Sequence, residues 1–140
     1  MDKKYEILDH PADLKIKAFG KDLAEVFVNA ALAIADQQTR FLELAPKSAK
    51  KEEEILIESD GFESLLVDWL SEILYRSEIN KKVYNNFEVT EFLEDPYKIK
   101  AKIKGIAVES KNIDIKAVTY HNLEIKKISD HWEAVIVFDI

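Results

Sequence analysis

The chain has 140 residues, of which 47% are hydrophobic and 34% are charged, and its formal net charge at pH 7 is −7. This size and balance suit one globular domain around one core, so we expect residues 1–140 to form a single domain. The acidic balance argues against direct nucleic-acid binding by phosphate neutralisation. No apolar run reaches the roughly eighteen residues that a membrane span needs, so we expect no membrane partner.

The chain contains no cysteine. Thiolate metal sites, disulfides and thiol nucleophiles are therefore excluded, and the composition suits the reducing cytoplasm. The residues that follow Met1 lack the apolar stretch of a signal peptide. We therefore expect a cytoplasmic protein.

The first half of the chain predicts a strand followed by a helix. Apolar and polar residues alternate at 14–19, which predicts a half-buried strand that ends at Gly20. Apolar residues then recur at helical spacing and predict a helix from about residue 22 to residue 36. Residues 37–51 predict a loop.

The rest of the chain predicts one more helix among several strands. Residues 53–59 predict a strand, and the apolar stripe at 62–74 predicts a second amphipathic helix. Further strands are predicted at 83–90, 98–104, 123–128 and 132–138, with a hairpin turn at 129–131. The pattern of residues 112–119 is mixed and predicts no single element. We expect an α+β fold in which two helices pack on a mostly antiparallel sheet, or sheets, of about seven strands.

Two segments carry carboxylates next to predicted strands. Asp13 follows His10 and Pro11 and precedes the strand at 14–19, where it could hold a metal or cap a turn. At the other end of the chain, Asp139 and the terminal carboxylate of Ile140 follow an apolar strand. Clustered carboxylates resist ionising together unless a cation joins them, and oxygen ligands suit Ca²⁺, Mg²⁺ or Mn²⁺. The alternative is a solvated acidic tail.

Three further groups of polar residues are candidate site residues. The stretch 116–121 includes Lys116 and His121, but strand alternation separates its polar side chains onto two faces. Asp68 and Glu72 share one face of the second helix, where paired acids are typical of a solvated surface. Asp36 is a candidate further ligand, because an acid at a helix C-terminus opposes the helix dipole.

Several of these segments share a characteristic order and spacing. They are His10-Pro11-Ala12-Asp13, Gly20 with the helix at 23–31, the helix with Leu65, Leu66 and Glu72, residues 115–121, and the final Asp139-Ile140. Taken together they resemble the archease family, small accessory proteins of the tRNA-splicing RNA ligase. The family usually has His-Thr-Ala-Asp in the first segment. Pro11 therefore removes a hydroxyl and leaves Asp13 unaffected.

The resemblance implies an archease-like sandwich and a protein that is not itself an enzyme. Its partner would be the ligase that joins RNA ends bearing a 2′,3′-cyclic phosphate or 3′-phosphate to a 5′-hydroxyl. The accessory protein promotes guanylylation of that ligase with GTP and its multiple turnover. The resemblance also implies a divalent metal, commonly Ca²⁺, held by Asp13, Asp139 and the terminal carboxylate of Ile140. Lys116 matches an important lysine of the family, and we expect it and His10 to lie beside the metal or to contact the partner.

Two other functions remain open at this point. A metal-dependent phosphohydrolase could use the same carboxylates to activate water, although the chain lacks clustered histidines and a clear nucleophile. A chaperone or adaptor without a metal role would need an exposed apolar patch, and the apolar stripes described above are typical of core.

Overall fold

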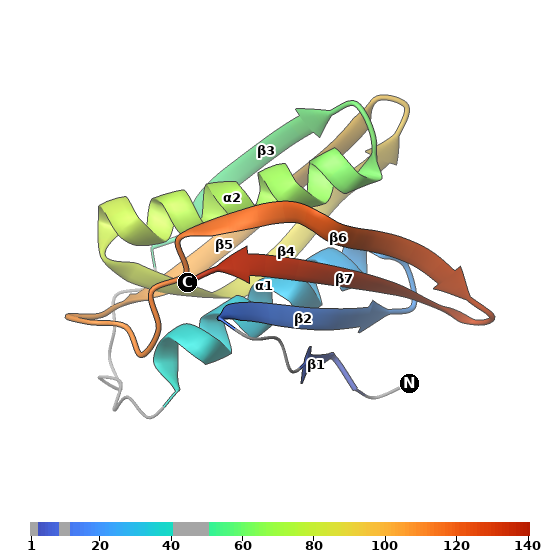
Figure 1. The fold of residues 1–140 in the computed structure, drawn as a ribbon. Coiled ribbons are helices and arrows are strands. Elements are labelled where there is room, and N and C mark those ends of the chain that lie inside the picture. The colour runs from blue at the N-terminus through green and yellow to red at the C-terminus, as the bar shows by residue number, and fades with distance from the viewer. Residues whose placement is uncertain (1–2, 9–11, 41–50) are drawn as a thin grey trace.

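The computed structural model describes residues 3–8, 12–40 and 51–140 (Figure 1). Within these ranges there are seven strands and two helices: β1 (Tyr5–Leu8), β2 (Asp13–Gly20), α1 (Leu23–Thr39), β3 (Glu53–Ser59), α2 (Phe62–Asn80), β4 (Lys82–Glu94), β5 (Tyr97–Ala107), β6 (Ala117–Ile128) and β7 (His131–Asp139). The predicted α+β class, the number of strands and the two helices are confirmed. Neither helix is long and apolar enough to cross a membrane.

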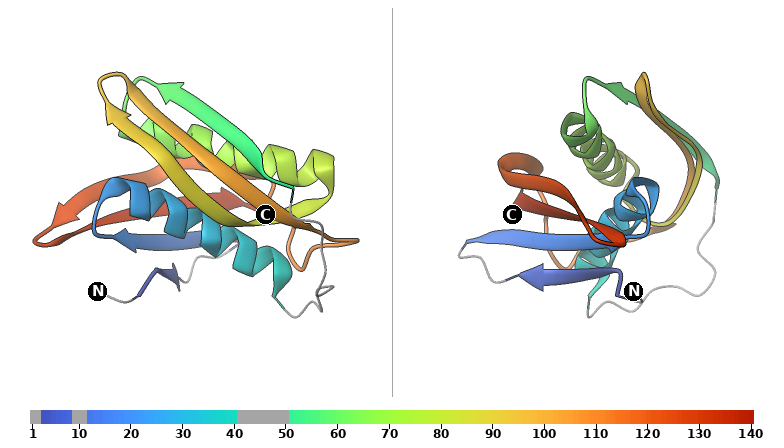
Figure 2. Two further views of the ribbon diagram at one scale, coloured as in Figure 1. Left: turned by 180° about the vertical axis from the view of Figure 1, so that it is seen from behind. Right: turned by 90° about the vertical axis from the view of Figure 1, so that its right-hand side faces the viewer.

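The strands form two antiparallel sheets. One has the order β1-β2-β7-β6, and the other has the order β3-β5-β4. Both helices lie between the two sheets (Figure 2). Helix α1 packs against β2 and β4, and α2 packs against β6 and all three strands of the smaller sheet. The sequence predicted helices that pack on a sheet; in the structure each helix is covered on two sides.

Helix α1 has the composition that this central position requires. Its Asp22 N-cap accepts a hydrogen bond from the Glu25 backbone N–H at 2.9 Å, which satisfies one of the free donors of the first turn. Its buried positions are numerous and include four alanines, so both sheets can approach closely. The helix continues to Thr39, three residues beyond its predicted end, because Gln38 is buried rather than part of a surface loop. Residues 41–50 of the predicted loop lie outside the described residues.

Helix α2 is joined to α1 through a fully buried tryptophan. The Nε1 group of Trp69 donates a hydrogen bond of 3.0 Å to the backbone carbonyl of Phe27, so the indole loses no hydrogen bond on burial. The helix extends to Asn80, beyond the predicted stripe at 62–74. It ends at Lys81, whose left-handed conformation (φ 53°) turns the chain into β4.

The alternation predicted for β5 is observed, and that predicted for the start of β6 is interrupted. In β5, Ile99, Ala101 and Ile103 are fully buried while the intervening lysines lie on the other face, as predicted. In β6 the register with β7 breaks between Thr119 and Glu124, so five steps along β6 match two steps along β7. The simple alternation expected from Lys116 to His121 therefore fails beyond Thr119.

Gly20 occupies a turn with no room for a side chain. A Cβ atom there would lie 2.6 Å from the Val26 nitrogen and 2.8 Å from the Asp22 carbonyl oxygen, both backbone atoms of the start of α1. We expect Gly20→Ala to lower the free energy of unfolding by about 1–3 kcal/mol, because backbone atoms must move to relieve the overlap. Urea unfolding followed by circular dichroism measures this.

The matched control for this prediction is Gly61→Ser at the N-cap of α2. The nearest atom to a Cβ there is Glu63 Oε1 at 3.7 Å, and serine is a preferred N-cap residue. The control should unfold at the same urea concentration or a higher one. Equal stability of the Gly20 variant and the parent protein would contradict the close packing of this turn.

His131 lies in a charged cluster at the opposite end of β7 from Asp139. Its Nε2 atom lies 2.8 Å from Glu133 Oε2, and its Nδ1 atom lies 3.2 Å from Asp130 Oδ1. Glu133 is also paired with Lys17 at 3.0 Å. The hydrogen bonds to Glu133 and Asp130 raise the pKa of His131 above its ordinary value of 6.5. Burial opposes ionisation of Glu133, but its hydrogen bonds from His131 and Lys17 hold its pKa below the usual range.

This cluster predicts a pH-dependent stability. A raised folded-state pKa means that protonated His131 stabilises the native state fully below pH 6.5, and that this stabilisation is lost as the pH rises through the folded-state pKa. The free energy of unfolding should therefore differ most between the parent protein and His131→Gln at acidic pH, and the difference should shrink with rising pH. His121→Gln, at an exposed position of β6, is the control. A difference that does not vary with pH would contradict the assignment.

Candidate functional site

The predicted metal ligands meet at one end of the larger sheet. Asp13 is the first residue of β2 and Asp139 is the last residue of β7, and the two are directly opposite in the antiparallel register. Asp139 is also opposite Ala117, the first residue of β6. Figure 1 shows the beginnings of β2 and β6 on either side of the C-terminal end of β7. Residues far apart in the sequence are thus adjacent here.

The register places the Asp13 and Asp139 side chains on the same face of the sheet. Directly opposite residues of an antiparallel pair project to one side, with Cα atoms about 4.5–5.5 Å apart. Asp13 is half-buried and Asp139 is exposed. Two carboxylates this close repel each other unless a cation offsets their charge. They are hard oxygen donors of the kind that Ca²⁺ and Mg²⁺ bind.

Within the described ranges, the two aspartates are not joined by a third acidic or histidine side chain. Among the residues that the structure describes, no group of three His, Cys, Asp or Glu side chains is placed to hold a metal ion. The third donor predicted from the sequence, the terminal carboxylate of Ile140, directly follows Asp139 and is not a side chain. The Ile140 residue is 40% exposed, so the terminus lies at the surface beside Asp139.

Lys116 is fixed beside the same aspartate through the backbone. Its N–H donates a hydrogen bond of 2.8 Å to the Asp139 carbonyl, and the preceding Ile115 is buried in the core. The Lys116 side chain is exposed, and its ammonium forms no ion pair with any described residue. The structure therefore places one cation at the end of the sheet where two carboxylates meet.

The described contacts do not bring the other two candidate residues, Asp36 and His10, to the aspartate pair. Asp36 is exposed on α1, and its Oδ2 atom accepts a hydrogen bond of 2.5 Å from the Tyr5 hydroxyl of β1. Burial of the phenol and this hydrogen bond raise the pKa of Tyr5 to about 12. The described contacts tie Asp36 to β1 and do not bring it to Asp13, so its role as a ligand stays a prediction. His10 and Pro11 lie outside the described residues.

The acids of the second helix have partners of their own. Ser59 donates a hydrogen bond of 2.5 Å to Asp68, and Glu72 forms an ion pair of 2.7 Å with Arg76 on the next turn of α2. Asp68 is exposed. These contacts agree with the interpretation of both acids as part of a solvated helix face.

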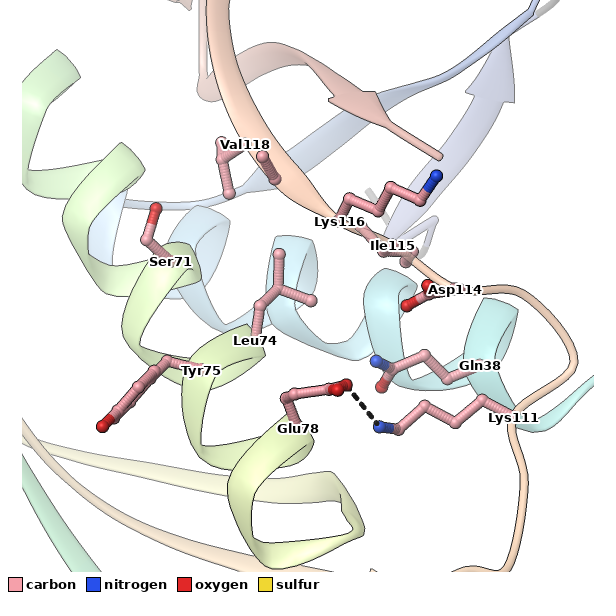
Figure 3. Close-up of a pocket in the computed structure, with 11 residues that line it drawn as sticks. Gln38, Ser71, Leu74, Tyr75, Glu78, Lys111, Asp114, Ile115, Lys116 and Val118 are labelled. Atoms are coloured by element: carbon pink, nitrogen blue, oxygen red, sulfur yellow. Dashed lines mark ion pairs between the residues drawn. The ribbon is translucent and has the colours of Figure 1, made fainter.

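A pocket that no sequence pattern predicted lies next to Lys116. This pocket has a volume of about 440 Å³ and separates α2 from the segment 111–118. Figure 3 shows its lining side chains, which come from the end of α1, from α2 and from this segment. The sequence pattern of residues 112–119 indicates neither a regular strand nor a clear loop, and this irregular segment forms one wall of the pocket. Three separate elements build the cavity, so no local pattern predicted it.

Comparison with known proteins identifies relatives along the whole chain. The Archease protein family (MTH1598/TM1083) matches residues 5–140. Protein archease of Methanosarcina barkeri is 43% identical, over 99% of this chain and 97% of the relative. Protein archease of Pyrococcus abyssi is 34% identical, over 99% of both chains.

Solved structures agree with this result. The solution structure of Methanobacterium thermoautotrophicum protein 1598 matches with a TM-score of 0.79 and 30% identity, over 97% of this chain and 98% of that one. The crystal structure of an archease, possible chaperone, from Thermotoga maritima matches with a TM-score of 0.70 over 96% of both chains. At 18% identity the latter shows the shared fold alone. By its sequence and its fold, this chain belongs to the archease family.

Proposed function

We propose that this protein is a metal-binding protein cofactor that activates the tRNA-splicing RNA ligase in tRNA splicing and RNA repair. In this proposal the protein is not itself an enzyme. It promotes guanylylation of the ligase and its multiple turnover. The observation that carries the proposal is the register of β2 with β7, in which Asp13 and Asp139 are direct neighbours. Membership of the archease family supports the choice of partner.

In this proposal Asp13, Asp139 and the terminal carboxylate of Ile140 hold one divalent cation. Ca²⁺ is the best candidate because it accepts several carboxylate oxygens in a flexible geometry, and Mg²⁺ and Mn²⁺ are the alternatives. A bound cation supplies positive charge that offsets the carboxylates and can accept further oxygen ligands. The strands fix the two aspartates before binding, so little conformational entropy is lost.

Two features of the protein suit contact with the ligase: the Lys116 side chain and the negative net charge. Lys116 is held beside Asp139 by its backbone hydrogen bond, and its ammonium remains available to an oxygen atom of the ligase. The net charge of −7 suits association with a basic, RNA-handling enzyme through charge complementarity. The same charge disfavours direct contact of this protein with RNA, so we propose the ligase and not its substrate as the partner, and the cytoplasm as the location.

The metal site predicts a specific pattern in calorimetric titrations with Ca²⁺ and Mn²⁺. Asp13→Asn, Asp139→Asn and a chain with one residue added after Ile140 should each bind at least about tenfold more weakly than the parent, a loss of about 1.4 kcal/mol or more. Each change removes or displaces one anionic donor. Glu88→Gln, at an exposed position of β4 in the other sheet, is the control and should bind as the parent does. Equal binding by all variants would contradict the assignment of the ligands.

The activating role predicts a loss of ligase stimulation in the same variants. Asp13→Ala and Asp139→Ala should each abolish most of the stimulation of ligase guanylylation and of multiple-turnover ligation. Glu88→Ala removes an exposed acid from β4, in the other sheet, and should stimulate normally. Undiminished stimulation by both aspartate variants would exclude the site from the activating role. Release of phosphate from simple phosphate esters by the protein alone would instead favour a phosphohydrolase.

A further inference from the structure

The pocket beside Lys116 has a preformed wall. We call it the α2 pocket. Its apolar and aromatic lining includes Leu74, Tyr75 and Val118, and its polar lining includes Gln38, Glu78, Lys111, Asp114 and Lys116. The segment that closes it is tied to both helices. The backbone N–H of Asn112 donates a hydrogen bond of 2.7 Å to the Gln38 carbonyl, and the Lys111 ammonium donates one of 3.3 Å to the Ser77 carbonyl. The cavity therefore exists without a ligand to shape it.

A buried amide side chain lines this pocket. Gln38 is only 3% exposed. The Ser77 hydroxyl donates its proton to the Lys82 carbonyl at 2.5 Å, so toward Gln38 it can only accept. The amide nitrogen of Gln38 must therefore face Ser77, as it does at 3.4 Å. This orientation leaves the amide oxygen without a donor among the described residues, and a buried acceptor of this kind favours a ligand that supplies an N–H group.

A carboxylate lies beside this acceptor. Asp114 is exposed and forms no ion pair or hydrogen bond with any of the described residues. Figure 3 shows its carboxylate and the Gln38 amide on the same side of the pocket, while the Lys116 side chain points away from Leu74 and Gln38. Lys111 is already engaged, with Glu78 at 3.9 Å and the Ser77 carbonyl. The lining thus carries two acids and two lysines, and Asp114 is its carboxylate without an ion pair to a described residue.

The opposite side of the pocket is apolar and aromatic. Leu74 and Val118 form this side, and Tyr75 is 60% exposed at the rim. Across Tyr75 a second hollow of about 510 Å³ contains Leu56 together with Glu58, Asp68 and Glu72. Leu56 is 55% exposed. Both hollows include Ser71 and Tyr75, so they are adjacent on either side of α2.

We propose that the α2 pocket receives an arginine side chain of the protein partner. A guanidinium group presents five N–H donors in a planar fork, which suits the Asp114 carboxylate and the Gln38 amide oxygen together. Its aliphatic stem packs on Leu74 and Val118, and its plane can stack on Tyr75. The second hollow, which contains Glu58, Asp68 and Glu72, receives the basic segment around this arginine. A phosphate-bearing ligand is disfavoured beside Gln38, because the Asp114 carboxylate repels it, Lys111 is engaged with Glu78, and the Lys116 side chain points away.

The identity of the partner as the RNA ligase rests on the proposed function, but the chemistry of the pocket does not. The pocket and the metal site are adjacent, since residues 114–116 connect the α2 pocket to the backbone of Asp139. One basic surface of a partner can therefore cover both. The experiment has one measurement that depends on the ligase and one that does not.

The first measurement is the affinity of the full-length protein for the tRNA-splicing RNA ligase. Asp114→Asn should weaken binding about tenfold or more, because it leaves a partner's guanidinium without its counterion at the interface, while Ca²⁺ binding is unchanged. Glu63→Gln, at an exposed position in the first turn of α2, is the matched control and should bind normally. Asp114 is exposed on a loop, so the substitution should not disturb folding. Equal affinity of Asp114→Asn and the parent would overturn the proposal.

The second measurement is an NMR titration of this protein alone with N-acetyl-arginine amide. Shifts should concentrate at Gln38, Leu74 and Val118, and should be lost in Asp114→Asn; the same shifts in that variant would overturn the proposal. If the parent protein does not bind the ligase at all, the proposed function is wrong. The titration with N-acetyl-arginine amide then tests by itself whether the α2 pocket binds a guanidinium group. A titration with N-acetyl-lysine amide tests whether the planar guanidinium group is required, because lysine has the same charge without that geometry. Shifts as large as those with the arginine compound would overturn the choice of a guanidinium. Shifts produced by inorganic phosphate at the same residues, with none from arginine, would reject a cationic ligand.

Discussion

The pairing of β2 with β7 is the constraint on which the candidate site depends. The eight residues of β2 are paired without interruption, from Asp13 opposite Asp139 to Gly20 opposite Trp132. A slip of one residue would turn the buried Ile16 and Ile136 out of the core, so hydrophobic burial fixes the register. Since Asp13 and Asp139 stand at the end of this ladder, the core itself holds the two carboxylates together. Their mutual repulsion is small beside the burial that a different register would lose.

The helices between the sheets determine what lies beside this site. Helix α1 is narrow because alanine fills many of its buried positions, and Trp69 of α2 hydrogen-bonds to its backbone. With α2 fixed in this way, its C-terminal half faces the segment that leads into β6. The α2 pocket is the space that remains between them. Its place next to Lys116 therefore follows from helix packing and from the turn that begins β6.

The regular parts of this structure could be predicted from the sequence, and the irregular parts could not. Alternation predicted β5 and the core face of β2 because one side of each strand is buried. Apolar spacing predicted where α1 begins but not where it ends, because its last turn buries the polar Gln38 against Ser77 of another helix. In β6, three extra residues between Thr119 and Glu124 interrupt the alternation. Asp13 and Asp139 were singled out from the sequence, but only the register shows that they are opposite one another.

Lys116 connects the two features that call for positive charge. Its N–H holds the carbonyl of Asp139, and Asp114, two residues earlier, carries the carboxylate of the α2 pocket. Because Ile115 between them is buried, this segment cannot shift at Asp114 without disturbing the hydrogen bond to Asp139. A cation at the sheet end and a guanidinium in the pocket would both reduce repulsion among acids on one edge of a protein of net charge −7. The two sites are therefore coupled by charge and by three residues of backbone, and a partner that engages one meets the other in a fixed position.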